Sequence, residues 1–259
     1  FSAFRSYEDC PYQYKIGHVL GVPTQQTPAV SFGSSIHLTL QKIGARLQEQ
    51  TGVVQSDIFG DGGVHTEIGV SAKDAVQFLH DSWVRGGYES IHDQDMHKDD
   101  AEKRIRAYVM DSIAHGWRVP LRTEKSFSLH IGETKFSGRI DAIFLLPDGT
   151  LELVDYKTGK PKETLDARHK QQLLLYQLAF LRLDDLKMLG EVSKLSYCYI
   201  TEDGPVYTSF LGTDEELSRM VGEVEEVSSS IEAGHFEAKP AKYTCDYCPF
   251  RTICQFRII

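Results

Sequence analysis

The residues with the clearest chemical potential lie in residues 137–159, which read SGRIDAIFLLPDGTLELVDYKTG. Asp141 is near the start of this stretch, and Asp155, Tyr156 and Lys157 are consecutive near its end. Two carboxylates and the backbone carbonyl of Tyr156 would form a hard oxygen site of the kind that suits Mg²⁺ or Mn²⁺. A lysine two residues after the second carboxylate can reach a metal-bound water or a phosphate oxygen. The same residues also occur on ordinary solvated hairpins. The rest of the sequence therefore has to decide between a metal site and a structural hairpin.

Two β-strands must position these side chains. Residues 138–146 are rich in Ile, Phe and Leu, the letters PDG form a turn, and apolar alternation resumes over 151–156. Side chains alternate between the two faces of a strand, so Asp155 and Lys157 project to the same side. An antiparallel pair joined by this turn brings Asp141 across from the end of the second strand.

The motifs GRID at 138–141 and VDYKTGKPK at 154–162 resemble the core of the PD-(D/E)XK nuclease superfamily, in particular the RecB-like nuclease domains of helicase-nucleases. The resemblance covers most of the chain. Ile140 stands where the family pattern has proline, a position at which RecB-like members vary. The resemblance implies an α/β fold, restriction-endonuclease-like, with a mixed central sheet flanked by helices. It also implies a Mg²⁺- or Mn²⁺-dependent deoxyribonuclease, an exonuclease rather than an endonuclease.

Two residues outside the hairpin match the same family pattern. His37 follows Gly33 by four residues on a predicted helix that begins at Ser31, and it resembles the histidine that joins the metal site. Glu124 resembles a glutamate that RecB-like nucleases place on the first strand near the metal. Each residue alone would more commonly be structural or solvated. The implied metal ligands are His37, Asp141, Asp155 and Tyr156, and the implied catalytic residues are His37, Glu124, Asp141, Asp155 and Lys157.

Gln172 and Tyr176 lie four residues apart on a helix predicted over 164–183, so they share a face. They match the family's Q-x-x-x-Y motif, which implies hydrogen bonds near the nucleic-acid strand and to the edge of the active site. Without the hairpin residues, the pair would be an ordinary feature of a helix surface.

The remaining pattern predicts strands before and after this helix, in an order typical of a mixed sheet flanked by helices. Helices are predicted at 2–8, 11–20, 71–85, 95–115 and 213–233, a loop at 50–69, and strands at 119–129, 133–136, 195–200 and 206–211.

Four cysteines form a second candidate site, and they are Cys10, Cys245, Cys248 and Cys254. A reducing cytosol disfavours disulfides, so metal binding explains clustered cysteines better. The spacing alone fits either Zn²⁺ or an iron-sulfur cluster. One cysteine before the core and three after it is similar to iron-sulfur nucleases that include AddB-type domains. This similarity implies a [4Fe-4S] cluster that joins segments 1–20 and 238–259, whereas Cys198 is predicted to lie in the core.

Composition limits the class of protein. A chain of 259 residues, 41% hydrophobic and 25% charged, is ample for one large globular domain, here a RecB-like domain over 1–259 with its core at about 31–233. No apolar run could span a membrane and no secretory leader is evident, which predicts a cytoplasmic protein. The chain begins at Phe1, inside a motif, so we expect a domain excised from a longer polypeptide.

The net charge of −9 argues against coating nucleic acid by bulk electrostatics. A local groove could still bind phosphates through Lys157, Lys160, Lys162, Arg168 and Lys170. The resemblance implies DNA as a partner, and a fused or bound helicase acting in recombination, repair or defence. The rival hypotheses are a non-catalytic DNA-binding or scaffolding module with a structural metal cluster, and a zinc-stabilised protein-interaction domain.

Overall fold

The computed structural model describes residues 1–57 and 68–258, and the chain divides into two compact units. The larger unit comprises residues 26–126 and 139–212, and the smaller unit comprises residues 1–25, 127–138 and 213–259. Most of the loop predicted at 50–69 lies outside the described residues, while its first part continues a helix up to Asp57.

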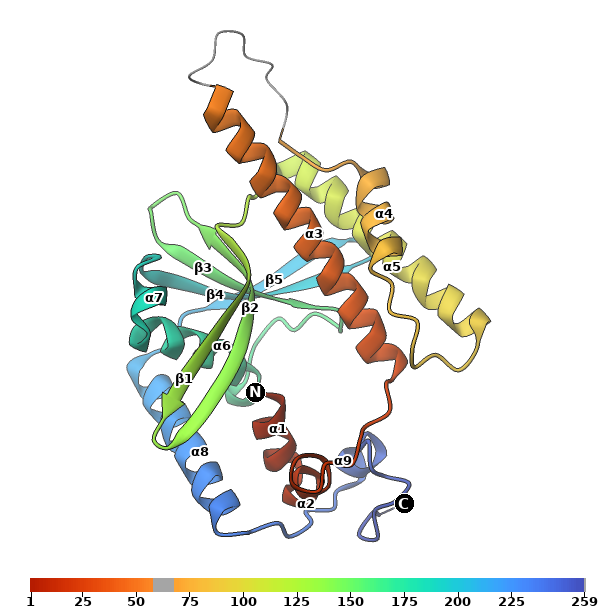
Figure 1. The fold of residues 1–259 in the computed structure, drawn as a ribbon, viewed down its shortest axis with the longest axis vertical. Helices are drawn as coiled ribbons and strands as arrows, with labels where there is room; N and C mark the ends of the chain where they lie inside the picture. Colours follow the sequence, from red (N-terminus) through yellow and green to blue (C-terminus); the bar gives the residue numbers. More distant parts are fainter. Residues whose placement is uncertain (58–67, 259) are drawn as a thin grey trace. The chain divides into compact units, whose positions relative to one another are not determined.

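Five strands form one mixed sheet in the order β1-β2-β3-β4-β5 (Figure 1). Strands β2 and β3 are antiparallel, β3 and β4 are parallel, and β4 and β5 are antiparallel. The strands are β1 (Arg122–Ile131), β2 (Thr134–Leu145), β3 (Leu151–Lys157), β4 (Val192–Thr201) and β5 (Gly204–Phe210). The predicted mixed sheet with flanking helices, the restriction-endonuclease-like α/β arrangement, is therefore confirmed.

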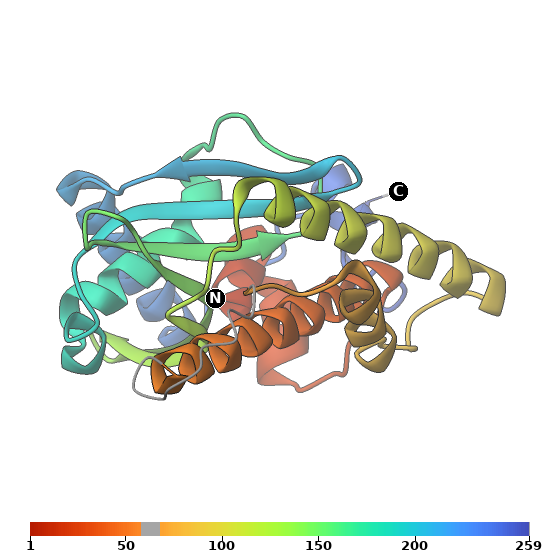
Figure 2. The ribbon, with the colours of Figure 1, turned by 90° about the horizontal axis from the view of Figure 1, so that it is seen from above.

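Helices pack along the sheet in the larger unit, where α3 and α5 run beside the strands (Figures 1 and 2). The apolar positions of α3, including Ile36 and Ile43, join Ile105 of α5 and Val154 of β3 in one buried core. The connection between the parallel strands β3 and β4 contains α6, which contacts both strands. The helices of this unit are α3 (Pro28–Asp57), α4 (Ala72–Asp81), α5 (Ile91–His115), α6 (Ala167–Arg182) and α7 (Asp184–Lys187).

Helix boundaries differ from the predicted ones where local capping decides them. Helix α3 begins at Pro28 and not at Ser31, because proline suits the first turn, where its missing N–H costs nothing. Helix α5 begins four residues earlier than predicted, because the Ser90 side chain accepts a hydrogen bond from the Asp93 amide at 3.0 Å. Two short predicted strands at 133–136 and 138–146 are one continuous strand, β2.

The smaller unit contains α1 (Ser2–Asp9), α2 (Pro11–Tyr14), a π-helical turn η1 (Lys15–Val19), α8 (Asp214–Glu232) and α9 (Lys242–Asp246). Helix α8 begins with a capping box in which Thr213 and Glu216 satisfy each other's backbone amides. The Tyr7 hydroxyl donates to the His235 carbonyl at 2.6 Å, which ties the first helix to the segment after α8.

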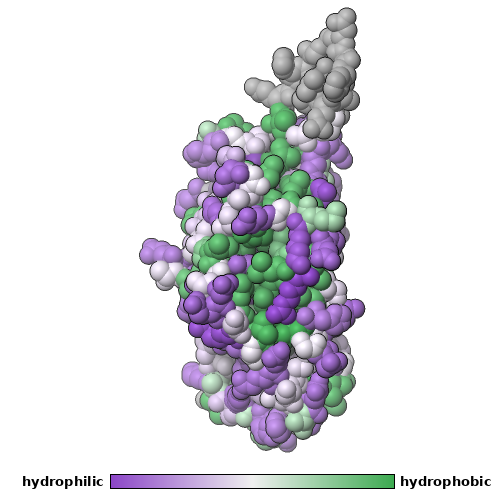
Figure 3. All heavy atoms as spheres, turned by 90° about the vertical axis from the view of Figure 1, so that its left-hand side faces the viewer, coloured by the Kyte–Doolittle hydropathy of each residue, from purple (hydrophilic) through white to green (hydrophobic). Residues whose placement is uncertain are grey.

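Among the described residues, no helix combines the length and apolarity that a membrane crossing requires. On the face drawn in Figure 3, hydrophobic residues are bordered by hydrophilic ones.

Candidate active site

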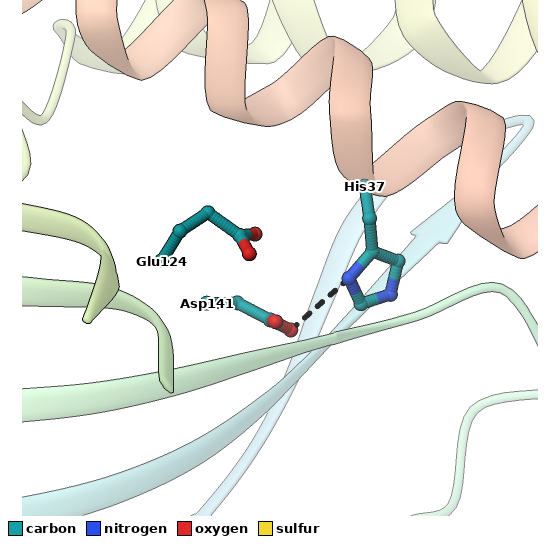
Figure 4. A group of neighbouring side chains, drawn as sticks. All are labelled: His37, Glu124 and Asp141. Atoms are coloured by element: carbon teal, nitrogen blue, oxygen red, sulfur yellow. Dashed lines mark ion pairs between the residues drawn. The ribbon is translucent and has the colours of Figure 1, made fainter. Parts of the chain in front are cut away.

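Three potential metal ligands converge in the larger unit, one each from α3, β1 and β2 (Figure 4). His37, Glu124 and Asp141 each offer one ligand atom, and these atoms all lie within 4.8 Å of one another. His37 Nδ1 is 3.3 Å from Asp141 Oδ2, the pair joined by a dashed line in Figure 4. One imidazole nitrogen and two carboxylates are a donor set that suits a hard or borderline divalent cation.

Strand pairing places Asp141 beside the end of β3. The last residue pair in the register is Ala142 with Val154. Asp141 and Asp155 are the next residues beyond this pair, one on each strand. The backbone amide of Tyr156 donates to Asp141 Oδ2 at 2.8 Å. This bond fixes one carboxylate oxygen and leaves the other for a ligand.

A second group of contacts surrounds Asp155 and Lys157 on β3. Lys157 Nζ lies 2.7 Å from Asp155 Oδ2 and donates to Gln172 Oε1 at 3.0 Å. The other end of the same amide, Gln172 Nε2, donates to Asp155 Oδ1 at 2.6 Å. Gln172 therefore links the carboxylate to the ammonium, which holds the lysine in one position.

Tyr176, one turn further along α6, extends this group. Its hydroxyl lies 3.1 Å from Asp155 Oδ1 and 2.9 Å from the Arg139 carbonyl oxygen, and it accepts from Gln172 Nε2 at 2.9 Å. The side chain is buried, with 4% of its surface exposed. These contacts suit a residue that positions Asp155, and they leave Tyr176 little surface for a nucleic-acid strand.

Burial and neighbouring charges of both signs set the pKa values here. Burial raises the pKa of Asp155, the Lys157 ammonium opposes this, and the Asp141 charge adds to it, so the pKa lies above its usual value. Burial also raises the pKa of Glu124, with partial opposition from the Arg139 guanidinium. For His37, burial lowers the pKa, but the hydrogen bond and charge of Asp141 outweigh it and the pKa is raised.

Two buried carboxylate oxygens in the site, Glu124 Oε2 and Asp155 Oδ2, have an ion pair and no further polar partner among the described residues. Each faces a cationic side chain, that of Arg139 or Lys157. Buried anionic oxygens without hydrogen bonds are costly unless a cation compensates them. Arg139 and Lys157 supply this compensation here, and the donor set of one imidazole nitrogen and two carboxylates fits a divalent cation.

Glu124 also has an unusual backbone. Its φ is 53°, which lies in the left-handed region. Among the described residues, no other non-glycine residue has a positive φ. Such a conformation costs roughly 1–2 kcal/mol for a residue with a Cβ, and it persists where the surroundings hold it. The strain accompanies a side chain turned toward His37 and Asp141.

The structure thus brings together the predicted site residues of the larger unit in two adjoining groups. His37, Glu124 and Asp141 form the compact donor group, whereas Asp155 faces Lys157 and α6. Tyr156 lies between them on β3, its amide bonded to Asp141. Sequence reasoning missed Arg139, which pairs with Glu124; the arginine stands inside the GRID motif, but nothing in the sequence pairs it with that glutamate.

The four cysteines of the second candidate site all belong to the smaller unit and line one hollow. The Cys10 Sγ accepts a hydrogen bond from the Lys239 amide at 3.4 Å. Their sulfur atoms do not form a compact group, since no three of them in the described chain lie within 4.8 Å of one another. Cys198 is buried in β4, the predicted core position.

Comparisons with known proteins extend these observations. A family model described as the PD-(D/E)XK nuclease superfamily matches residues 1–255. A search of curated proteins found no match. A solved structure from Eubacterium rectale, described as a candidate exonuclease, is 12% identical over 100% of this chain and 89% of that chain, with a TM-score of 0.52. The structure of SSO0001 is 20% identical over 84% of this chain and 95% of that chain, with a TM-score of 0.38.

Proposed function

Because the chain belongs to the PD-(D/E)XK nuclease superfamily, we propose that it is a metal-dependent nuclease that hydrolyses DNA phosphodiester bonds. The observation that carries this proposal is the convergence of His37, Glu124 and Asp141 beside a lysine held by Gln172.

In this proposal His37, Glu124 and Asp141 would hold the cation, Mg²⁺ or Mn²⁺, with Asp155 and the Tyr156 carbonyl adjoining. When bound, a divalent cation lowers the pKa of a coordinated water and offsets negative charge on the phosphate. Lys157 orients the attacking water through its Nζ or donates to a phosphate oxygen, and Asp155 and Gln172 keep that ammonium in place. Tyr176 holds Asp155.

The finer parts of the proposal concern the substrate. We propose exonuclease action on DNA ends or single strands, together with a helicase, in recombination, repair or defence. The RecB-like motifs support the helicase, and the fold shared with a protein described as a candidate exonuclease is consistent with action on ends. Lys160 and Lys162, exposed in the loop after β3, are available for phosphate contacts.

We also propose that Cys10, Cys245, Cys248 and Cys254 hold a [4Fe-4S] cluster with a structural role. Support comes from the hollow that all four line. A tetrahedral Zn²⁺ with bonds of about 2.3 Å would hold its sulfurs roughly 4 Å apart. The choice of an iron-sulfur cluster over Zn²⁺ rests on the similarity of the cysteine arrangement to AddB-type domains.

The test is cleavage of end-labelled single- and double-stranded DNA with Mg²⁺, Mn²⁺ or EDTA. Wild type is compared with Lys157→Ala and with Lys187→Ala, a matched control whose Lys–Asp ion pair is exposed on α7. We expect metal-dependent products from wild type and the control, and a loss of about 100-fold or more in Lys157→Ala. A folded wild type that cuts nothing would favour the binding-module hypothesis, whereas an unaffected Lys157→Ala would overturn the catalytic role of Lys157.

A further inference from the structure

Arg139 and Glu124 form an ion pair at the edge of the proposed metal site. Glu124 is mostly enclosed, with 11% of its side chain exposed, whereas the Arg139 side chain is 64% exposed. The backbone of Arg139 is held by the Tyr176 hydroxyl, which lies 2.9 Å from its carbonyl oxygen. The arginine is therefore anchored at its main chain while its guanidinium lies at the surface of the site.

The guanidinium and a bound cation would compete for one carboxylate. Glu124 Oε2 faces the Arg139 guanidinium and belongs to the side chain that completes the donor group with His37 and Asp141. Both partners would be positive, so a cation on Glu124 would weaken the attraction that holds the guanidinium there. A guanidinium released at this point would keep its five N–H donors, arranged in a fork that fits a phosphate.

We propose that Arg139 is a metal-gated phosphate-binding residue: it neutralises Glu124 before the cation binds and contacts a DNA phosphate afterwards. The inference rests on the proposed function, because it needs a cation at Glu124. In this inference, cation binding releases the Arg139 guanidinium, which can then contact DNA. The cation and DNA should therefore each strengthen the binding of the other to the protein.

Two substitutions separate the roles, and the Arg46–Glu49 ion pair on α3 supplies matched controls. Arg139→Gln removes the competitor, so the protein should bind Mn²⁺ about fivefold more tightly, the size expected for losing one ion pair. The same variant should bind DNA about tenfold more weakly once cation is present, with a salt slope smaller by about 0.7. Glu124→Gln should free the guanidinium and increase DNA affinity in EDTA.

The experiment uses the whole chain. Mn²⁺ affinity is measured by titration calorimetry, and binding of a labelled single-stranded oligonucleotide is measured by fluorescence anisotropy in Ca²⁺ and in EDTA, with melting temperatures to confirm folding. Arg46→Gln and Glu49→Gln remove the same charges elsewhere and should change neither the Mn²⁺ affinity nor the effect of cation on DNA binding.

The outcomes distinguish this inference from the proposed function. Weaker Mn²⁺ binding by Arg139→Gln would overturn the competition, and unchanged DNA binding in Ca²⁺ would overturn the phosphate contact. An unchanged DNA affinity of Glu124→Gln in EDTA would show that the guanidinium is not held back. A wild type that binds no Mn²⁺ would overturn the metal site itself, and with it the proposed nuclease.

Discussion

The Tyr176 hydroxyl lies 3.1 Å from Oδ1 of Asp155 and so connects helix α6 to strand β3. Asp155 in turn faces Lys157 at 2.7 Å, which means that a buried phenol on one element orients the ammonium proposed to act on the substrate. This relationship can be tested by altering Tyr176, which is proposed to orient Asp155 without contacting DNA itself.

Tyr176→Phe removes this hydroxyl and keeps the ring. We expect kcat to fall about 10- to 100-fold, as for partners that orient site residues, while KM for DNA stays unchanged. Steady-state cleavage kinetics measure both. Tyr207→Phe is the matched control, because its hydroxyl interacts with Cys198 and Arg118 and not with Asp155. A change in KM alone would instead assign Tyr176 to DNA binding.

Gly138→Ala should destabilise the protein. A Cβ at Gly138 would lie 2.5 Å from a ring carbon of Phe127, so the ring or the strand would have to shift. We expect a loss of about 1–3 kcal/mol in the free energy of unfolding, measured by urea denaturation. The double variant Gly138→Ala with Phe127→Leu should recover part of it. Gly222→Ala on α8 has open space and should not destabilise, so equal losses would refute the steric explanation.

The buried carboxylate of Glu152 should make stability depend on pH. Burial alone would raise its pKa, but the hydrogen bond from Ser196 and the charges of Arg118 and Lys194 outweigh burial and hold the pKa below its usual value. The pKa of a glutamate in an unfolded chain is about 4.3. The carboxylate therefore stabilises the fold above that pH, and this contribution is lost as pH falls through the lower pKa of the folded state.

Glu152→Gln should consequently cost about 1–3 kcal/mol at pH 7, because it weakens the buried hydrogen bonds at this position while the partly exposed Arg118 and Lys194 side chains can turn to solvent. The difference from wild type should begin to shrink below about pH 4.3, where the unfolded carboxylate becomes protonated, and shrink further as pH falls through the lower pKa of the folded state. Urea denaturation at pH 3.5, 5 and 7 measures this difference. Glu202→Gln, an exposed turn residue, is the control. A difference independent of pH would mean that the loss reflects packing.

Cys248→Ser tests the proposed cluster. We expect the purified variant to lose iron and colour, and its melting temperature to fall by more than about 5 °C, because a bound metal group stabilises the folded state. Cys198→Ala removes a cysteine outside the hollow and should retain the iron. Stoichiometric zinc without colour in the wild type would replace the iron-sulfur assignment, and an unchanged melting temperature would remove the structural role.

The hairpin and the order of sheet elements could be predicted because they depend on local signals. Alternating apolar residues and one tight turn are enough to place Asp141 opposite Asp155, and the register agrees. Helix starts were less accurate, since side chains such as Ser90 and a proline at position 28 decide them within a single turn.

The electrostatic partners could not be predicted, because they come from strands and helices far apart in the sequence. Glu152 resembles a solvated strand residue, yet it is fully buried against Arg118, Ser196 and Lys194. The Arg139–Glu124 pair likewise depends on how β1 lies beside β2 and on the left-handed backbone at Glu124. Neither the Glu152 contacts nor the Arg139–Glu124 pair can be predicted from the residue types and their spacing.

The hollow lined by the cysteines has a consequence for how the protein matures. Cys10 emerges from the ribosome before every residue of the proposed active site, and Cys245, Cys248 and Cys254 emerge after all of them. The four-cysteine set is therefore incomplete while the catalytic unit is being synthesised. Delivery of the proposed cluster would then be a late step that follows synthesis. A shortage of iron would leave full-length chains with an assembled sheet and a smaller unit that lacks its cluster.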